Sequence, residues 1–502
     1  MLPILLLALA LRIWGISWGL PFLYHPDEHQ LVERYLWMVK TGDLNPHWFI
    51  YPSFPLYINA AGSGLYFLLK LALGRFHSLE EIAFPHVLIM GAGIIGDPKI
   101  FWIGRMISIL FGLGAVYLSY RCAKWVSGKA LPGLLAALFT AVSNANVTQS
   151  RLILPNIFVA FFAILTIWFS LQIYKRGRTS DYALAGLAIG LTAASKYNGG
   201  LVALVPAAAH LIRTGWKGWK DGRIYLAAVI AVLAFLLTNP YAVLDFPSFS
   251  RDLIQAKNDY AGGWPGFSSI SSLWYLSYLW RFEPLSSLAA LGGIVWAAWR
   301  RQKDALIAGL FPLAYFLFIS AFRYYNEHTL LHLLPTAHVM AGVFFGWLLE
   351  TGKARFPSRN LLVTAGLGLF IAAACLIPLK TTIETQAQIL QVNGRETSRV
   401  WIEENIPAGT TIAIESYSPY LDPQKYQLVI VPPFLPKELT WYRENGVQFL
   451  VFSQGMYGRY FADPVHHQAE IDLYEQLFKA LDPVKTFNEG DYEIRIYRMP
   501  PQ

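Results

Sequence analysis

Long apolar runs alternate with short polar segments along most of the chain. Eleven of these runs approach the length, about 20 residues, that a helix needs to cross a bilayer. They lie at about 2–23, 100–121, 131–148, 156–174, 181–195, 199–212, 224–239, 279–299, 305–321, 334–350 and 360–379. Two short runs, 181–195 and 199–212, indicate either two tilted helices or one broken element. The pattern predicts a mainly α-helical, polytopic membrane protein.

Basic residues are concentrated in every second segment between the predicted helices, and this distribution predicts how the chain is oriented in the membrane. One set of segments holds Arg121, Lys124, Lys129, Lys175, Arg176, Arg178, Arg213, Lys217, Lys220, Arg223, Arg300, Arg301, Lys303, Lys353, Arg355 and Arg359. The opposite set holds only Arg151, Lys196, Arg251, Lys257 and Arg323. Basic residues favour the cytoplasmic side, so we expect the N-terminus inside and the C-terminus outside. This assignment requires the apolar segment 54–73 to be a juxtamembrane helix on the outer surface, with a second such helix near 28–41.

The pattern changes near residue 395 and divides the chain into two predicted domains, 1–394 and 395–502. The second part alternates helical and strand-like runs, with strands expected after a Pro-Gly turn at 407–409 and at 426–431, 448–452 and 492–497. Helices are expected at 437–445 and 467–481. We therefore predict a small extracytoplasmic α/β domain. It contains neither a glycine-rich phosphate loop nor a nucleophile motif.

Composition supports the membrane assignment. Of the 502 residues, 55% are hydrophobic and only 14% are charged, well below the roughly one quarter typical of soluble domains. The net charge of +8 is spread over short segments, which indicates topology rather than nucleic-acid binding. The two cysteines, Cys122 and Cys375, argue against a disulfide framework or a cysteine metal site. The N-terminal run lacks a basic region and a cleavage site, so we expect a retained first helix.

Charged and polar side chains are concentrated in segment 24–59, just after the first apolar run. Asp27 and Glu28 are adjacent carboxylates in a chain that is poor in charge, and aromatic and proline residues surround them. A carboxylate at the membrane surface can act as a general base. A solvated loop is the alternative explanation. His25, Asp27, Glu28 and His29 could also hold a divalent cation, although consecutive residues rarely converge on one ion.

Other polar residues fall on the same predicted face. The basic residues Arg151, Lys196 and Arg323 could bind a lipid phosphate, or could simply extend towards the headgroups. Their neighbours supply candidate substrate-binding side chains, namely Tyr51, Asn156, Tyr197, Asp245 and His328. The segment 261–267, AGGWPGF, predicts either a glycine-hinged aromatic lid or a plain connector.

Taken in order, several motifs resemble the GT-C superfamily of membrane glycosyltransferases, in particular the protein O-mannosyltransferase and lipid A aminoarabinose transferase group. These motifs are HPDE, GDLNPHWFIYPSFPLY, GRMISILFGLGAVYLSYRCAKWVSG, SRLILPN, GLAIGLTAASKYNGG, NPYAVLDFPSF and FRYYNEHTLLHLLP, between residues about 24 and 340. The resemblance implies a polyprenyl-phosphate-linked sugar donor, an inverting transfer at the external face and no obligatory metal. It implies that Asp27 is the general base and Glu28 its partner. Arg151 and Lys196 become candidates for binding the donor phosphate.

Two departures from the group weaken this residue-by-residue transfer. Asn156 stands where many members have an aspartate, which puts a second acidic site in doubt. Tyr51, Pro52 and Ser53 stand where some members have a lysine before a proline pair, so that phosphate contact must come from elsewhere.

The apolar pattern and the resemblance together thus imply a multi-pass protein of a plasma membrane that acts as an inverting glycosyltransferase. The acceptor, whether protein, lipid or polysaccharide, is left open, as is the sugar. A transporter or flippase of a lipid-linked or small solute is the alternative, but no clear internal repeat supports it. A non-catalytic scaffold would leave the acidic pair unexplained.

Overall fold

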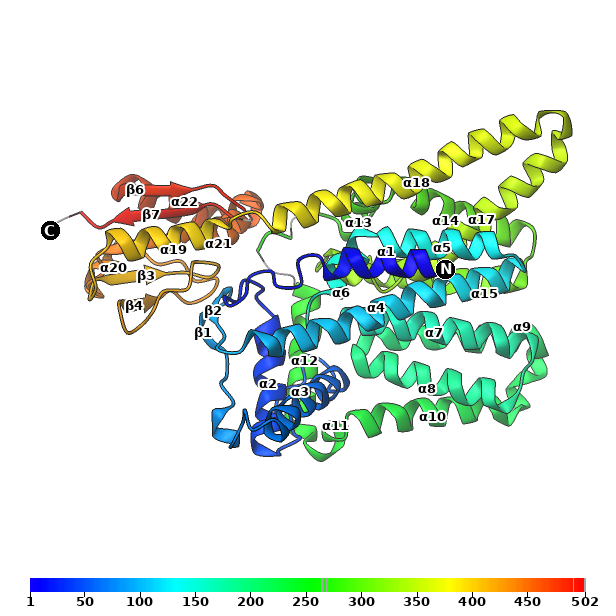
Figure 1. Cartoon of the computed structure of the whole chain (residues 1–502), viewed down its shortest axis with the longest axis horizontal. Coiled ribbons are helices and arrows are strands. Elements are labelled where there is room, and N and C mark those ends of the chain that lie inside the picture. The colour runs from blue at the N-terminus through cyan, green and yellow to red at the C-terminus, as the bar shows by residue number, and fades with distance from the viewer. Residues whose placement is uncertain (263–264, 268, 491, 501–502) are drawn as a thin grey trace.

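The computed structural model describes residues 1–262, 265–267, 269–490 and 492–500. Most of the chain forms an elongated bundle of helices (Figure 1). The bundle comprises α1 (Leu2–Ile13), α4 (Pro98–Ser127), α5 (Ala130–Val142), α6 (Asn144–Ser150), α7 (Asn156–Lys175), α8 (Thr179–Ser195), α9 (Leu204–Thr214), α10 (Gly222–Thr238), α13 (Ser271–Phe282), α14 (Pro284–Trp299), α15 (Lys303–Ile319), α17 (Leu334–Arg355) and α18 (Asn360–Ile389). Each predicted span falls on or across these helices.

Among the described residues, three helical segments could cross a membrane by length and composition, namely Pro98–Ser127, Asn156–Lys175 and Asn360–Asn405. The pair α5 and α6, bent by 59° at Ser143, could form a fourth. Large apolar side chains such as Leu237, Leu361 and Leu369 are exposed on the bundle, which suits a lipid-facing surface. These features indicate a multi-pass membrane protein, and the predicted number of eleven crossings stays a prediction.

The first helix is shorter than the predicted span of 2–23. It ends at Ile13, and Gly15 and Gly19 follow with φ values of +86° and +79°. Left-handed backbone of this kind is favourable for glycine and ends a helix. Residues 14–23 are therefore non-helical turns that carry the chain from α1 to α2.

Close helix packing depends on small residues. Gly186 and Gly190 lie four residues apart on α8, and a Cβ at either position would collide with the backbone carbonyl of Ala227 or Ala231 on α10. Glycines at this spacing allow two helix backbones to approach closely in a membrane. The tight pairing of α8 and α10 positions the end of α8, where Lys196 follows.

Short helices and a hairpin cap one end of the bundle. They are α2 (Glu28–Thr41), α3 (Phe54–Ala72), β1 (His86–Ile89), β2 (Ala92–Ile94), α11 (Tyr241–Leu244), α12 (Phe246–Gly262) and α16 (Glu327–Leu330). Helices α2 and α3 occupy the ranges predicted for juxtamembrane helices, and α2 runs across the direction of the bundle (Figure 1). The basic inter-helix segments lie at the other end, where Lys175 pairs with Asp304 and Arg223 donates to the carbonyl of Gly177.

The C-terminal region is a five-stranded mixed sheet flanked by helices. Its elements are α19 (Gly394–Asn405), β3 (Thr411–Ile414), β4 (Gln427–Ile430), α20 (Leu439–Glu444), β5 (Phe449–Ser453), α21 (Gln454–Phe461), α22 (Pro464–Ala480), β6 (Asp482–Phe487) and β7 (Ile494–Arg498). The strand order is β4-β3-β5-β7-β6, with β4, β3 and β5 parallel and β7 antiparallel to both of its neighbours. The sequence did not predict β6 or α21.

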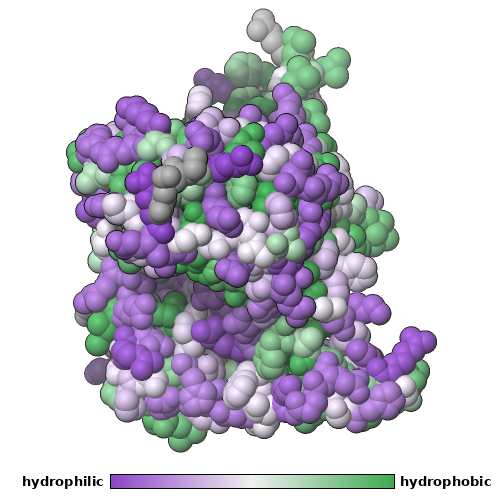
Figure 2. Space-filling view, turned by 90° about the vertical axis from the view of Figure 1, so that its left-hand side faces the viewer, coloured by the Kyte–Doolittle hydropathy of each residue, from purple (hydrophilic) through white to green (hydrophobic). Residues whose placement is uncertain are grey.

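Arg395 fixes the sheet region to the turn before α2. Its guanidinium lies 4.0 Å from the ring centroid of Tyr24, and it donates hydrogen bonds to the carbonyls of Tyr24 at 3.1 Å and Gly91 at 3.4 Å. The backbone N–H of Tyr417 also donates to the carbonyl of Met90 at 2.7 Å. Viewed from this end, the molecule has a hollow between the sheet region and the α2–α3 side (Figure 2).

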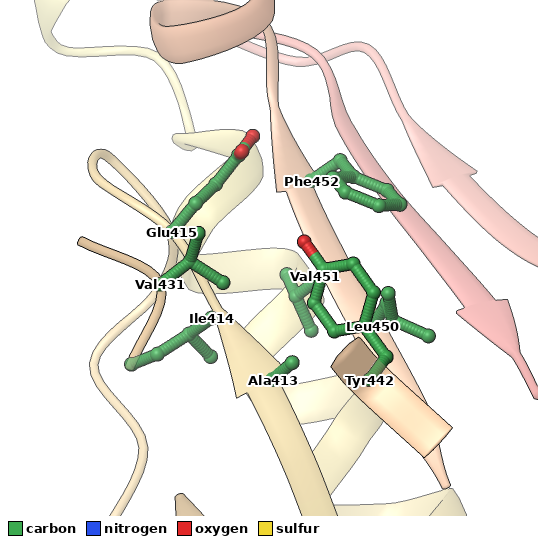
Figure 3. A pocket seen from close by; sticks show the side chains of 8 residues that line it. All are labelled: Ala413, Ile414, Glu415, Val431, Tyr442, Leu450, Val451 and Phe452. Carbon is green, nitrogen blue, oxygen red and sulfur yellow. The ribbon is translucent and has the colours of Figure 1, made fainter. Parts of the chain in front are cut away.

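A buried carboxyl lies at the end of β3, inside the sheet region. Glu415 lies beside Val431, Ile414 and Phe452 (Figure 3). It accepts hydrogen bonds from the N–H of Ser453 at 2.7 Å and from the hydroxyl of Tyr474 at 2.7 Å. Burial raises the pKa of Glu415 to about 8. The folded sheet region therefore favours the protonated carboxyl at neutral pH.

This burial predicts a pH-dependent stability. Between pH 4.5 and 8 the carboxyl is ionised in the unfolded chain and protonated in the folded one, so the free energy of unfolding falls as pH rises through this window. The loss reaches on the order of 4 kcal/mol by pH 8. Glu415→Gln, which keeps the shape without the charge, removes this pH dependence. Thermal melts of the full chain at several pH values measure it.

The matched control is Glu444→Gln, because Glu444 is an exposed carboxylate of the same region. We expect it to keep the wild-type pH profile. An unchanged profile in Glu415→Gln would show that Glu415 is ionised in the folded protein.

Candidate active site

A cavity of about 940 Å³ lies where the bundle, the α2 side, helix α12 and the sheet region meet. Five residues predicted from the sequence line it, namely Asp27, Tyr51, Lys196, Tyr197 and His328. Aromatic side chains form much of the wall, with a few charged groups among them. This composition is typical of a site that binds a substrate with an apolar part and a polar part.

Asp27 is the N-cap residue of α2 and faces this cavity. Its N–H donates to Nδ1 of His25 at 3.1 Å, which fixes the backbone turn. In the part of the chain that the structure describes, no hydrogen bond or ion pair engages its carboxylate. Burial raises the pKa values of Tyr51 and Tyr324 well above their ordinary value, and the charge of Asp27 contributes to both shifts. Asp27 is therefore available to accept a proton from a bound ligand.

Glu28 points away from the cavity into a buried ion pair. Arg105 of α4 donates to it twice, from Nε to Oε1 at 3.1 Å and from Nη2 to Oε2 at 2.8 Å. The N–H of Ile153 adds a third hydrogen bond at 2.9 Å. Burial alone would raise the pKa of Glu28, but the charge and hydrogen bonds of Arg105 outweigh it and lower the pKa. Both oxygens of Glu28 are occupied within the protein.

Lys196 supplies a buried cation to the cavity. It directly follows α8 and is only 4% exposed. Its Nζ donates to Oδ1 of Asn156 at 3.1 Å, and it lies 5.8 Å and 5.7 Å from the ring centroids of Tyr51 and Tyr260. Among the described residues no carboxylate pairs with it. A buried ammonium held only by neutral groups can bind an anion of the substrate.

Two predicted substrate-binding residues, Asn156 and His328, lie close to this lysine. Asn156, at the start of α7, contacts Lys196 rather than the cavity, and its amide donates to Oε1 of Gln149 at 3.3 Å. His328 lines the cavity on α16, and burial and then the charge of Lys196 lower its pKa well below the ordinary value. His328 is therefore a neutral side chain, able to donate one hydrogen bond and accept another.

Besides Glu28 and Asn156, three further predicted residues lie away from the cavity wall. Arg151 is buried and donates to Gln386 of α18. Arg323 is exposed on the protein surface, and Asp245 accepts a hydrogen bond from Asn45 at 3.0 Å. The proposed lid at 261–267 includes residues 263–264, which lie outside the described residues. Of the three predicted phosphate-binding cations, the structure thus places only Lys196 in the cavity.

The proposed divalent-cation cluster is not assembled as such. His25 and Asp27 line the cavity, whereas Glu28 is engaged by Arg105. Within the described ranges no group of three or more His, Cys, Asp or Glu side chains could hold a metal ion.

Sequence reasoning missed the contribution of the sheet region to the cavity. Tyr417, Phe434 and Arg459 line it, together with Met90 of the β1–β2 hairpin. No local sequence signal marks these residues, because a soluble α/β region contains many surface aromatics and arginines. Only the tertiary contact of this region with the turn before α2 brings them to the site.

A comparison with protein-family models matches residues 95–247 to the family described as dolichyl-phosphate-mannose-protein mannosyltransferase. No curated protein matches the chain in sequence.

Solved structures are similar to the chain over its whole length. One is ArnT from Cupriavidus metallidurans bound to undecaprenyl phosphate, with 15% identity and a TM-score of 0.53, covering 100% of this chain and 99% of that one. Another is the archaeal oligosaccharyltransferase AglB from Archaeoglobus fulgidus in complex with an inhibitory peptide and a dolichol-phosphate. It has 12% identity and a TM-score of 0.56, and covers 98% of this chain and 74% of AglB. At these identities the matches show the shared fold. The family match over α4 to α11 and the fold together confirm the resemblance of this chain to the GT-C membrane glycosyltransferases of the mannosyltransferase and ArnT type.

Proposed function

We propose that this protein is an inverting glycosyltransferase that moves a sugar from a polyprenyl-phosphate carrier to an acceptor. The observation that carries the proposal is the presence, in one cavity, of the unengaged carboxylate of Asp27 and the buried ammonium of Lys196. The fold supports it, because similar structures hold undecaprenyl phosphate or a dolichol-phosphate. The family match points to the same class of donor.

The reaction needs few groups. An acceptor hydroxyl attacks the anomeric carbon as the bond from that carbon to the phosphate oxygen breaks. Asp27 takes the proton of the hydroxyl, and the polyprenyl phosphate leaves with the electron pair of the broken bond. Lys196 stabilises the negative charge that develops on the leaving phosphate. A single displacement of this kind inverts the configuration at the anomeric carbon.

We place the reaction at the outer face of a plasma membrane. The cavity lies at the end of the bundle opposite the basic inter-helix segments, and such segments favour the cytoplasmic side. The sheet region, which shares this end, would then be extracytoplasmic.

We assign Glu28 a positioning role. Its ion pair with Arg105 fixes the start of α2, and neither of its oxygens is available to a substrate. Of the two adjacent acids, Asp27 would thus take part in the reaction, and Glu28 would stabilise the structure around it.

The first test is release of polyprenyl phosphate. Purified protein is given a polyprenyl-phosphate sugar and a membrane lipid extract, and Asp27→Asn is compared with wild type. We expect the variant to lose about 100-fold or more in kcat, because the base is gone. Its melting temperature should stay near that of wild type, since no described residue depends on this carboxylate.

Glu33→Gln is the matched control, because Glu33 lies on the same helix away from the cavity. It should release polyprenyl phosphate at the wild-type rate. Equal release from Asp27→Asn would refute the assignment of the base. No release by wild type with any donor would favour the transporter alternative.

Lys196→Gln tests the phosphate contact. Loss of a charge-assisted hydrogen bond worth about 1.5–3 kcal/mol raises the KM for the donor by roughly 10- to 100-fold. Lys257→Gln removes an exposed cation of the same cavity and should change KM less than about threefold. Steady-state kinetics over donor concentration measure both. A larger effect at Lys257 would transfer the assignment to that residue.

Glu28→Gln tests whether Glu28 stabilises the fold or takes part in the reaction. Removing one partner of a buried ion pair costs about 3–5 kcal/mol, so we expect a clear fall in melting temperature. Asp27→Asn, measured alongside, should not show this fall. A Glu28→Gln protein with wild-type melting and no turnover would instead make Glu28 a catalytic residue.

A further inference from the structure

The sheet region contributes a polar aromatic surface to the cavity. Tyr417 follows β3, Phe434 follows β4 and Arg459 lies on α21, and all three line the cavity that contains Asp27. Burial raises the pKa of Tyr417 to about 12, and Asp27 is among the charges that contribute to this shift. The surface formed by Tyr417, Phe434 and Arg459 is therefore within electrostatic reach of the proposed base.

This surface is held in place. Tyr417 has a φ of +66°, and its N–H donates to the carbonyl of Met90 at 2.7 Å. Gly91 and Gly455 pack so closely that a Cβ on either would lie about 3 Å from Tyr417. A non-glycine residue in left-handed backbone is strained, and such residues concentrate at binding sites.

The arginine is bound only by neutral groups. Its Nη2 donates to the hydroxyl of Tyr417 at 2.6 Å, and its Nε donates to the carbonyl of Gly455 at 3.0 Å. The guanidinium lies 5.2 Å from the ring centroid of Tyr417 and 5.7 Å from that of Phe434. No carboxylate pairs with Arg459 in the described ranges.

Two other arginines of the same region are neutralised by carboxylates. Arg399 pairs with Glu396 and Glu403, and Arg495 pairs with Glu493. What distinguishes Arg459 from these two arginines is that it lines the cavity and has no carboxylate partner among the described residues. A cavity-facing guanidinium with unsatisfied charge is suited to bidentate contact with a carboxylate or phosphate.

This cation is separate from Lys196. Lys196 is attached to the bundle through Asn156, whereas Arg459 lines the cavity from the sheet region. A donor phosphate bound at Lys196 would leave Arg459 available for the second substrate.

We propose that Arg459, with Tyr417 and Phe434, forms the acceptor subsite and binds an anionic group, a phosphate or a carboxylate, on a sugar-containing acceptor. The guanidinium contacts the anion, and the two rings offer apolar faces to the sugar. This inference rests on the proposed function, because it assumes that the donor occupies the Lys196 side.

Ligand-detected NMR on the full-length protein tests the subsite with three probes: glucose 6-phosphate, glucuronate and glucose. The measurements are made with saturating polyprenyl phosphate, so that the donor site is occupied. We expect wild type to bind at least one anionic hexose about tenfold or more tightly than glucose, as a charge-assisted pair implies. The two anionic probes distinguish a phosphate from a carboxylate acceptor.

Arg459→Gln should lose the preference for the anionic hexose while still binding polyprenyl phosphate. Arg459→Lys keeps the positive charge but loses the bidentate geometry of the guanidinium, so it should retain part of the preference. Lys196→Gln is the matched control: it should keep the anionic preference and bind polyprenyl phosphate more weakly.

Three results would overturn the subsite: no anionic preference in wild type, an unchanged preference in Arg459→Gln, or loss of polyprenyl-phosphate binding in that variant. Failure of the proposed function is a different result, because it requires that wild type release no polyprenyl phosphate. An anionic preference without such release would leave an anion-binding site at Arg459 but refute the transferase, and with it the acceptor role of that site.

Discussion

The ion pair between Glu28 and Arg105 determines where the chemistry can occur. Arg105 also donates to the carbonyls of Ile16 at 2.6 Å and Trp18 at 3.0 Å, so one guanidinium joins α4, the turns after α1 and the start of α2. Neighbouring residues on a helix point about 100° apart. Fixing Glu28 inward therefore turns Asp27 towards the cavity. The pair is buried, and breaking it would release the turn that presents the base.

The sheet region is attached to the same turn. Arg395 stacks on Tyr24, three residues before Asp27, and Phe22 forms an isolated bridge with Ile94 beside the β1–β2 hairpin. The cavity is consequently a composite of two parts of the chain that are distant in sequence. Arg395 contacts the turn that carries Asp27, and not only the rim of the cavity. A displacement of the sheet region would therefore also move Asp27.

The sequence predicted the elements better than it predicted their contacts. Apolar runs located the bundle helices, because a membrane helix must be apolar along its length whatever it packs against. Edge strand β6, with the sequence DPVKTF, was missed because it is mostly exposed and only Phe487 is buried, so no apolar alternation marks it. The first helix was predicted too long, since hydropathy does not register the left-handed glycines at 15 and 19.

Single polar residues were harder to interpret, for a physical reason. Arg151, Lys196 and Arg323 look alike in sequence, each a lone cation near a helix end. In the structure one is buried against Gln386, one faces the cavity and one is exposed. Asp27 and Glu28 differ in the same way. Which neighbour each meets depends on helix rotation and packing, which local pattern does not specify.

Charge pairing distinguishes the buried carboxylates of the bundle from the charged groups that border the cavity. Glu283 and His338 lie 2.7 Å apart inside the bundle, and Glu28 meets Arg105, so each of these two buried carboxylates has a basic partner, whereas the buried Arg12 is held by neutral oxygens. Asp27, Lys196 and Arg459 lack such a partner among the described residues, although all three border one cavity. An unpaired charge away from water is unfavourable, so an unpaired charge that borders a cavity is a candidate contact for a ligand of opposite charge. Among the acids and cations that line this cavity, Asp27, Lys196 and Arg459 together suit a transfer between two anionic substrates that requires removal of one proton.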